Sequence, residues 1–325
     1  MKISLVVPCY NEEAMLPITV KELSRFLAEC AAEGLAGPDS EIVLVDDGSR
    51  DRTWELISQA AQEYPAVRGL KLSRNRGHQN ALLAGLEKAE GDFIISLDAD
   101  LQDDVNVIKE MIRGAEAGMD IALGVRRNRA TDSAFKRLTA QGFYRLMGLM
   151  KVSLIYNHAD FRGLSRRVVA ALMEYKEVNL FLRGIIPELG FPTVLVYYDR
   201  KERVAGETKY PLRKMLSFAW QGVTSFSTFP LRLISFLGLL LAGGSLTVVL
   251  WALGLHFFTD QTIPGWTSTL VPLLFTSGVQ LLGLGIIGEY LGKLYLEVKR
   301  RPRYFIEKTT DDQKGGEIDK SVADG

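Results

Sequence analysis

The sequence predicts an α/β domain, built on a mostly parallel sheet, that is followed by a transmembrane hairpin of two helices. Over the first 97 residues short apolar runs alternate with helix-like segments, a pattern typical of parallel sheets covered by helices on both faces. Residues 233–255 and 266–288 contain no charged side chain, and each run exceeds the about 20 residues needed to cross a bilayer. We therefore divide the chain into a domain, an interfacial helix, a transmembrane region and a tail expected to be disordered, at residues 1–210, 211–229, 230–300 and 301–325.

Four apolar runs, each followed by a polar cluster, define the parallel sheet. The predicted strands cover residues 3–7, 41–45, 67–72 and 93–97, with helices at about 15–33, at 53–63 and in the segment that ends at residue 89. Right-handed crossovers place the carboxyl ends of parallel strands along one edge, so the clusters should converge. These clusters are Tyr10-Asn11-Glu12, Asp46-Asp47, Arg74-Asn75 and the pair Asp98 and Asp100. A further predicted strand, at residues 121–124, leads to the basic residues Arg126, Arg127 and Arg129.

The segment Ile94–Asp104, IISLDADLQDD, carries the strongest indication of chemistry. In an extended chain Asp98 and Asp100 point the same way, and two carboxylates that face one point repel each other unless a cation lies between them. Oxygen ligands at the end of a parallel strand suit Mg²⁺ or Mn²⁺. The alternative is a strand followed by an acidic turn that caps the next helix, an interpretation that also suits Asp103 and Asp104.

Composition and missing motifs exclude several classes of function. The sequence has no GxGxxG after its first strand and no GxxxxGK[ST], which argues against a dinucleotide dehydrogenase and a P-loop NTPase. The formal net charge is zero, so no overall basic field favours nucleic acid as a partner. Cys9 and Cys30 lack metal-like spacing and no signal peptide is evident, which favours reduced thiols in the cytosol. What remains is a nucleotide site that neutralises a diphosphate with a metal ion.

The basic residues around the two apolar runs predict their orientation. The connector at residues 256–265 has no Lys or Arg, whereas Lys and Arg precede the first run and follow the second. By the positive-inside rule both flanks are cytoplasmic, so the domain should lie in the cytosol, tethered to the bilayer. Residues 211–229 have apolar side chains at helical spacing, which suits an in-plane helix at the lipid boundary or a lid packed on the domain. Residues 133–150 leave a similar choice between a packed helix and an interfacial one.

Seven short motifs in a fixed order resemble those of a known family. PCYNEE, VDDGS and DADLQ are similar, in order and separation, to motifs of family 2 glycosyltransferases of the GT-A fold, a Rossmann-like nucleotide-sugar domain. RNRGHQNA, ADFRG, NLFLRG and RVAGETKY, followed by the two apolar runs, resemble the polyprenyl-phosphate sugar transferases, especially the bactoprenol glucosyltransferases and the dolichol-phosphate mannose synthases. The resemblance covers about residues 2–300. It implies an enzyme of this class.

The resemblance also implies roles for individual residues on the donor side. The nucleoside pocket would be lined by Pro8, Tyr10 and Glu12, and the base would be read by Asp47 with Asp46 beside it. The Mg²⁺ or Mn²⁺ ion would be bound by Asp98, Asp100 and Gln102.

On the acceptor side the resemblance implies a set of basic residues and one carboxylate. The acceptor phosphate would be bound by Arg126, Lys136, Arg137 and Arg203. Lys136 stands where we expect arginine in the mannose synthases, and Ala140 where we expect serine, which is a departure at the acceptor contacts. Asp160 matches the position usually proposed as the catalytic base. A phosphate monoester has a second pKa near 6 and attacks without losing a proton, so Asp160 acts either as a base or as an orienting group.

These observations predict inverting, metal-dependent transfer of a hexose, glucose from UDP-glucose, to undecaprenyl phosphate, a polyprenyl phosphate. The reaction is expected at the cytoplasmic face of a bacterial inner membrane, where a multi-pass enzyme would supply a lipid-linked sugar for cell-surface glycans such as modified O-antigen. Another donor, GDP-mannose or UDP-amino-arabinose, is an alternative, and so is a non-catalytic nucleotide-sugar-binding membrane scaffold. The QxxRW motif of processive polysaccharide synthases is missing. The resemblance further implies a homotetramer, with a flippase and a downstream transferase as partners.

Overall fold

The computed structural model describes residues 1–127, 158–177, 181–199, 229–258 and 265–312. The chain forms two compact units, one made of Met1–Tyr210 together with Pro302–Gly325 and the other of Pro211–Arg301. The domain boundaries drawn from the sequence stay a prediction. The return of the C-terminal residues to the first unit was not predicted. The helices predicted at 133–150 and 211–229 lie outside the described residues.

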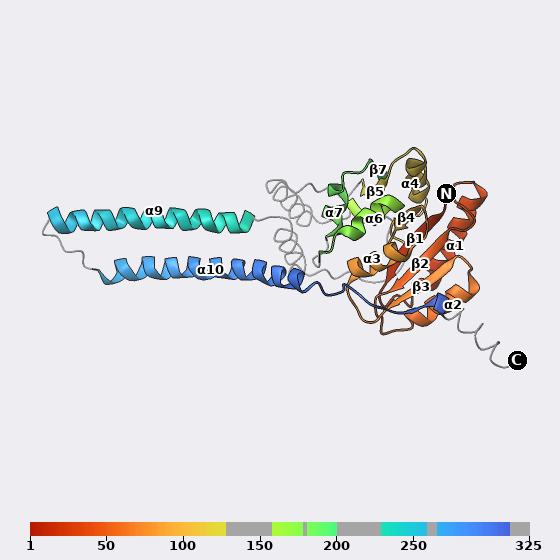
Figure 1. Ribbon diagram of the computed structural model, residues 1–325, viewed down its shortest axis with the longest axis horizontal. Coiled ribbons are helices and arrows are strands. Elements are labelled where there is room, and N and C mark those ends of the chain that lie inside the picture. The colour runs from red at the N-terminus through yellow and green to blue at the C-terminus, as the bar shows by residue number, and fades with distance from the viewer. Residues whose placement is uncertain (128–157, 178–180, 200–228, 259–264, 313–325) are drawn as a thin grey trace. The chain divides into compact units, whose positions relative to one another are not determined.

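An eight-stranded mixed sheet forms the centre of the first unit (Figure 1). Its strand order is β7-β5-β6-β4-β1-β2-β3-β8. The strands β3, β2, β1 and β4 run parallel to one another, which confirms the predicted α/β fold. Strand β6 lies antiparallel between β4 and β5, and β8 lies antiparallel to β3. The strands are β1 (Ile3–Cys9), β2 (Glu41–Asp46), β3 (Val67–Leu72), β4 (Phe93–Ser96), β5 (Ile121–Arg126), β6 (His158–Ser165), β7 (Thr193–Tyr198) and β8 (Ile306–Thr309).

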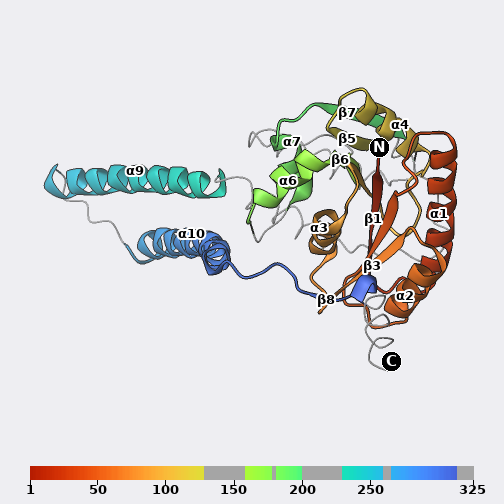
Figure 2. The ribbon, with the colours of Figure 1, turned by 45° about the vertical axis from the view of Figure 1, so that its right-hand side comes forward.

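Helices cover both faces of the sheet, as Figure 2 shows for α1 and α2 on one side and α3 on the other. The alternation of side chains along β1 explains this arrangement, because Ile3, Leu5 and Val7 face α1 whereas Val6 faces α3. At Gly85 of α3 a Cβ atom would lie 2.3 Å from Val6 Cγ1, so the absence of a side chain lets α3 approach the sheet closely. The helices of this unit are α1 (Leu16–Ala32), α2 (Thr53–Glu63), α3 (His78–Lys88), α4 (Val107–Glu116), α6 (Arg166–Glu174) and α7 (Leu182–Glu188).

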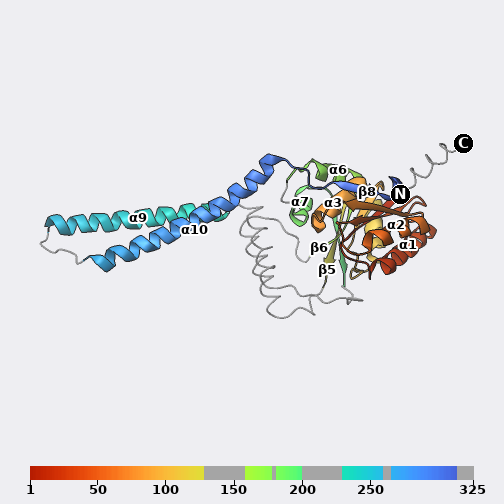
Figure 3. The same ribbon diagram turned by 90° about the horizontal axis from the view of Figure 1, so that it is seen from below.

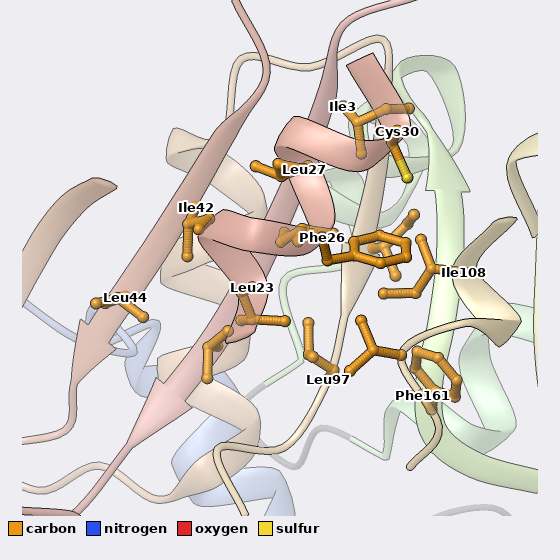
Figure 4. Close-up of a cluster of buried hydrophobic side chains, with 14 of the residues drawn as sticks. Ile3, Leu23, Phe26, Leu27, Cys30, Ile42, Leu44, Leu97, Ile108 and Phe161 are labelled. Carbon is orange, nitrogen blue, oxygen red and sulfur yellow. The ribbon is translucent and has the colours of Figure 1, made fainter. Parts of the chain in front are cut away.

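The hydrophobic core lies between the sheet and helices α1 and α4. Figure 4 shows Phe26 of α1 among side chains from β1, from the end of β4, from α4 and from β6. Phe161 of β6 and Ile108 of α4 are almost fully buried in the same cluster. Cys30 is buried there as a free thiol, and Cys9 is the second buried free cysteine. The core therefore fixes the four parallel strands, and with them the loops at their carboxyl ends.

The second unit contains two long helices, α9 (Phe229–Phe258, 30 residues) and α10 (Trp266–Lys299, 34 residues), which lie side by side (Figures 1 and 3). Large apolar side chains are exposed along both helices, for example Leu239 at 72% and Leu281 at 69%. Judged over the residues that the structure describes, no helix combines the length and the apolar character that a membrane crossing requires. The transmembrane hairpin therefore stays a prediction.

Residues 302–312, which we call the C-terminal strap, pack on the first unit. Within the strap, β8 pairs with the edge strand β3, and the backbone N–H of Gly69 donates to Thr310 Oγ1 at 2.9 Å. Arg68 Nε donates to Asp311 at 2.6 Å, and Tyr304 binds Glu87 of α3. The prediction of a disordered tail over 301–325 is thus wrong for the strap. The reason is that its polar side chains leave no apolar pattern, while the backbone of an edge strand offers unpaired hydrogen-bonding groups whatever the side chains are.

Candidate active site

A cavity of about 320 Å³ lies at the carboxyl ends of the parallel strands. It brings together the ends of β1, β2 and β4 and the segment between β3 and α3, so the predicted convergence of these loops is observed. Its lining consists of Pro8, Cys9, Tyr10, Glu12, Asp47, Asn75, Gly77, His78, Asp98, Ala99 and Asp100.

The two acidic residues at the end of β2, Asp46 and Asp47, face different surroundings. Both oxygens of Asp47 accept backbone hydrogen bonds, from the N–H of Arg76 at 2.7 Å and of Gly77 at 2.9 Å. Desolvation and the neighbouring Asp46 raise the pKa of Asp47, and these two hydrogen bonds oppose the rise. Asp46 is fully buried, and its Oδ1 accepts the N–H of Ser49 while its Oδ2 has no hydrogen-bond partner among the described residues. Asp47 therefore fixes the loop before α3 against the end of β2.

Asp98 and Asp100 follow β4 and line the same cavity. Loss of hydration raises the pKa of Asp98, and the carboxylates of Asp160, Asp103 and Asp100 raise it further, whereas His78 lowers it. The Nε2 atom of His78 lies 3.7 Å from Asp98 Oδ1. The carboxylates thus create a negative potential that favours a cation at this end of the cavity.

The loop that carries these carboxylates is held from both sides. Thr19 of α1 donates its hydroxyl to the carbonyl oxygen of Ala99 at 2.7 Å. Leu101 has a φ of 51°, a left-handed conformation that is uncommon for a residue with a side chain. The backbone N–H of Gln102 lies 3.3 Å from Asp100 Oδ1, and the Gln102 side chain is buried. The loop is therefore fixed by specific contacts in a locally strained shape.

The donor set of this loop fits a divalent cation. Two carboxylates at one end of a nucleotide-sized cavity are what Mg²⁺ takes from proteins when substrate phosphates supply further ligands. Among the residues that the structure describes, no group of three or more His, Cys, Asp or Glu side chains forms a ready-made metal site. Asp98 and Asp100 would leave the other ligand positions of such an ion to phosphate oxygens and water.

Asp160, on β6, lies between two arginines. Arg183 of α7 contacts both of its oxygens, with Nη2 at 2.7 Å from Oδ2 and Nε at 3.2 Å from Oδ1, and Arg162 also binds Oδ1. Burial alone would raise the pKa of Asp160, but the two arginines outweigh it and hold the pKa well below its usual range. A carboxylate of this kind is a poor proton acceptor. Asp160 is instead placed to hold the side chains of Arg162 and Arg183 in position.

Comparison with known proteins places this site in a family. The model of "Glycosyl transferase family 2" matches residues 4–173, which include the cavity. The chain is 50% identical to "Uncharacterized glycosyltransferase YkoT" of Bacillus subtilis (strain 168), covering 94% of this chain and 91% of that protein. It is 41% identical to "Prophage bactoprenol glucosyl transferase homolog" of Escherichia coli (strain K12), covering 95% and 99%, and 43% identical to "Bactoprenol glucosyl transferase" of Shigella phage SfX, covering 94% and 99%. The chain belongs to glycosyltransferase family 2.

Arg126 of this glycosyltransferase is anchored by two residues to which the sequence assigned no binding role. Its Nε donates to Tyr198 Oη at 3.2 Å, and its Nη2 lies 3.4 Å from Asp103 Oδ1. Tyr198 in turn donates its hydroxyl to Asp103 Oδ1 at 2.5 Å. We call these three residues the Asp103 cluster. The interpretation of Asp103 as part of a helix-capping turn is therefore wrong: its carboxylate links the loop after β4 to the ends of β5 and β7.

The transferase also contains two cavity residues that were not predicted individually. These are His78, the first residue of α3, and Gly77, its N-cap; Asn75, which belongs to the predicted Arg74-Asn75 cluster, precedes them and lines the same cavity. The segment RNRGHQNA after the third predicted strand was the available signal, but nothing in its spacing indicates which of its side chains faces the cavity. The residues Lys136, Arg137 and Arg203, predicted at the acceptor phosphate, lie outside the described part of the chain.

Proposed function

We propose that the glycosyltransferase transfers glucose from UDP-glucose, with inversion, to a polyprenyl phosphate such as undecaprenyl phosphate. One observation carries the proposal: the cavity that joins Asp98 and Asp100 to Tyr10 and Asp47 lies in a chain 41–43% identical to bactoprenol glucosyl transferases over nearly its whole length. The product would be a lipid-linked sugar for cell-surface glycans. GDP-mannose and UDP-amino-arabinose are the alternative donors. The tetramer, the flippase and the downstream transferase remain expectations from the resemblance.

In this proposal one set of residues binds the sugar donor and another binds the acceptor. Pro8, Tyr10 and Glu12 line the pocket for the nucleoside of the donor, and Asp47, with Asp46 beside it, reads the base. Asp98 and Asp100, with Gln102 beside them, would hold a Mg²⁺ or Mn²⁺ ion, which supplies the positive charge that stabilises a diphosphate leaving group. The basic residues Lys136, Arg137 and Arg203, together with Arg126, bind the acceptor phosphate, because the planar fork of arginine matches phosphate oxygens.

The proposed function is tested by incubating the purified protein with undecaprenyl phosphate and a panel of labelled nucleotide sugars. We expect label from UDP-glucose, and not from GDP-mannose or UDP-amino-arabinose, in the lipid fraction, and the β-linked product that inversion requires. Transfer from another donor of the panel would change the assigned sugar. Binding of nucleotide sugar without any transfer would favour the non-catalytic scaffold.

Asp160 acts in this reaction as an orienting group. The acceptor phosphate needs no base, and two arginines already hold the Asp160 carboxylate in its charged form. We expect kcat/KM to rise as the pH increases through about 6, where the acceptor becomes dianionic, and then to stay level as the pH increases further. Because the pKa of Asp160 is lowered, this carboxylate stays ionised throughout that range and adds no limb to the profile.

A pair of variants separates the two roles of Asp160. As an orienting group, Asp160 acts through its arginines, so Asp160→Asn and Arg183→Ala should lower kcat to similar extents and the double variant should be no worse than either. For Asp160→Asn, kcat/KM should still rise as the pH increases through about 6. A variant whose rate instead climbs with hydroxide concentration, and which is far less active than Arg183→Ala, would identify Asp160 as the base.

We also propose that the transferase is a membrane protein whose second unit forms a hairpin across the bilayer, with both flanks on the cytosolic side. The uncharged runs 233–255 and 266–288 and the exposed apolar side chains of α9 and α10 support this proposal. A cysteine introduced at Gln261 should then react with an impermeant thiol reagent added to intact cells, whereas one at Lys314 should not. Cys9 and Cys30 are buried, so the background should be low. The reverse pattern of labelling would contradict the proposed orientation.

A further inference from the structure

The Asp103 cluster combines two buried anchors with one partly exposed cation. Tyr198 is 3% exposed and Asp103 6% exposed, whereas the side chain of Arg126 is 27% exposed. Both anchors contact the Nε and Nη2 edge of the guanidinium. Since this group is rigid and planar, holding one edge fixes the direction in which the whole group faces.

The cluster is joined to the loop that carries the cavity carboxylates, because Arg126 contacts Asp103 of that loop. Burial lowers the pKa of Arg126, but Tyr198 and Asp103 outweigh that effect, and the carboxylate of Asp98, which lines the cavity, raises the pKa of Arg126 further. Asp103 also lies only three residues after Asp100. One contact network therefore sets both the position of a cation and the path of the loop that carries the cavity carboxylates.

The hydroxyl of Tyr198 can be separated from the rest of its side chain. Its ring packs edge-to-face on Phe161, with ring centroids 5.5 Å apart and an interplanar angle of 86°. On another side the ring closely approaches Gly124 of β5, where a Cβ atom would lie 3.1 Å from it. Replacing Tyr198 with phenylalanine would keep this packing and remove only the hydrogen bonds to Asp103 and Arg126.

We propose that Asp103 and Tyr198 are positioning residues that orient Arg126 toward a substrate phosphate. The proposal rests on the proposed function for the identity of the two phosphates at the site, the diphosphate of UDP-glucose and the monophosphate of the polyprenyl acceptor. Asp103 compensates the positive charge of Arg126 on its buried side, so the proposed role depends on the direction in which the guanidinium is held and not on a net positive charge of the cluster.

The test is a double-mutant cycle measured by binding, so that it does not depend on turnover. The affinities of the full-length protein for UDP and for farnesyl phosphate, a short-chain polyprenyl phosphate, are measured for Arg126→Ala, Tyr198→Phe and the double variant. We expect Arg126→Ala to weaken one ligand by about tenfold or more, as for loss of a charge-assisted contact. Tyr198→Phe should weaken the same ligand by about threefold to tenfold, and it should have no further effect when Arg126 is alanine. The ligand that weakens identifies the phosphate.

Two comparisons make the result decisive. Tyr197→Phe removes the hydroxyl of a neighbouring tyrosine that is 50% exposed, and it should leave both affinities unchanged. Asp103→Asn should weaken the same ligand as Tyr198→Phe, while the thermal unfolding of Tyr198→Phe stays near that of the wild type. Additive losses from Arg126→Ala and Tyr198→Phe, or unchanged affinities in either variant, would overturn the positioning role. Failure of the proposed function would instead appear as an absence of sugar transfer by the wild-type protein.

Discussion

Asp98→Asn is expected to abolish sugar transfer without unfolding the protein, and Asp100→Asn should do the same. Asparagine keeps the shape of the side chain but removes one of the two negative charges that would hold the cation. Loss of the cation should cost about 4 kcal/mol of transition-state stabilisation, roughly a thousandfold in kcat. The fold should not suffer, because the Asp98 side chain is 38% exposed and its pKa is raised by partial loss of hydration and by neighbouring carboxylates, so the folded state gains little from its charge. Thermal unfolding of Asp98→Asn should therefore occur near the temperature of the wild type.

A control and a second measurement belong to this experiment. Asp104→Asn makes the same change four residues after Asp100, at a carboxylate that accepts the N–H of Asn106. This variant should keep most of the activity. Added Mn²⁺ should raise the unfolding temperature of the wild type and not that of the Asp98→Asn and Asp100→Asn double variant. Full activity in EDTA, or an active double variant, would rule out a metal held by these residues.

Removal of the C-terminal strap should have the largest effect on stability. A chain that ends at Arg301 loses the pairing of β8 with β3, the hydrogen bond from Gly69 to Thr310 and the ion pair between Arg68 and Asp311. At about 0.5 to 1.5 kcal/mol for each net hydrogen bond, these contacts add up to about 3 to 5 kcal/mol, a large part of the stability of a typical domain. We expect the unfolding midpoint of the first unit in urea to fall accordingly.

The matched control for this deletion ends the chain at Asp312, which removes residues 313–325 and keeps the strap. Its unfolding midpoint should equal that of the full-length protein. Thr310→Val should lie between the two, because it removes one hydrogen bond from a residue that is only 3% exposed. Equal midpoints for the chains that end at Arg301 and at Asp312 would show that the strap contributes nothing to stability.

Most of the parallel half of the sheet could be predicted from the sequence. Strands β1 to β4 are apolar runs with a clear helical segment between each pair, which predicts that they run parallel, whereas their order in the sheet, with β4 beside β1, was not predicted. Strand β8 could not be predicted, because IEKT has too few apolar side chains to form a pattern and its pairing with β3 spans more than 230 residues. Local propensity carries no information about so distant a partner.

Part of the candidate site could likewise be predicted from the sequence, and part could not. Asp98, Asp100, Asp47 and Tyr10 follow predicted strands directly, so their convergence follows from the direction of those strands. The partners of Arg126 do not follow from any local pattern. Tyr198 ends a strand that is added at the far edge of the sheet, and only the pairing of β7 with β5 brings it beside Arg126. Contacts across non-sequential strands thus require the tertiary structure.

The strap has a further consequence for how the protein is made. A ribosome adds about 5 to 20 residues per second, so roughly 12 to 48 s pass between the synthesis of β3 and that of β8, about 240 residues later. During this interval both apolar helices are synthesised while the hydrogen-bonding edge of β3 stays uncovered, in a form open to pairing with another nascent chain. The catalytic unit is completed only after the whole second unit has emerged. Premature termination anywhere in α9 or α10 is therefore expected to leave a first unit whose uncovered β3 edge favours aggregation.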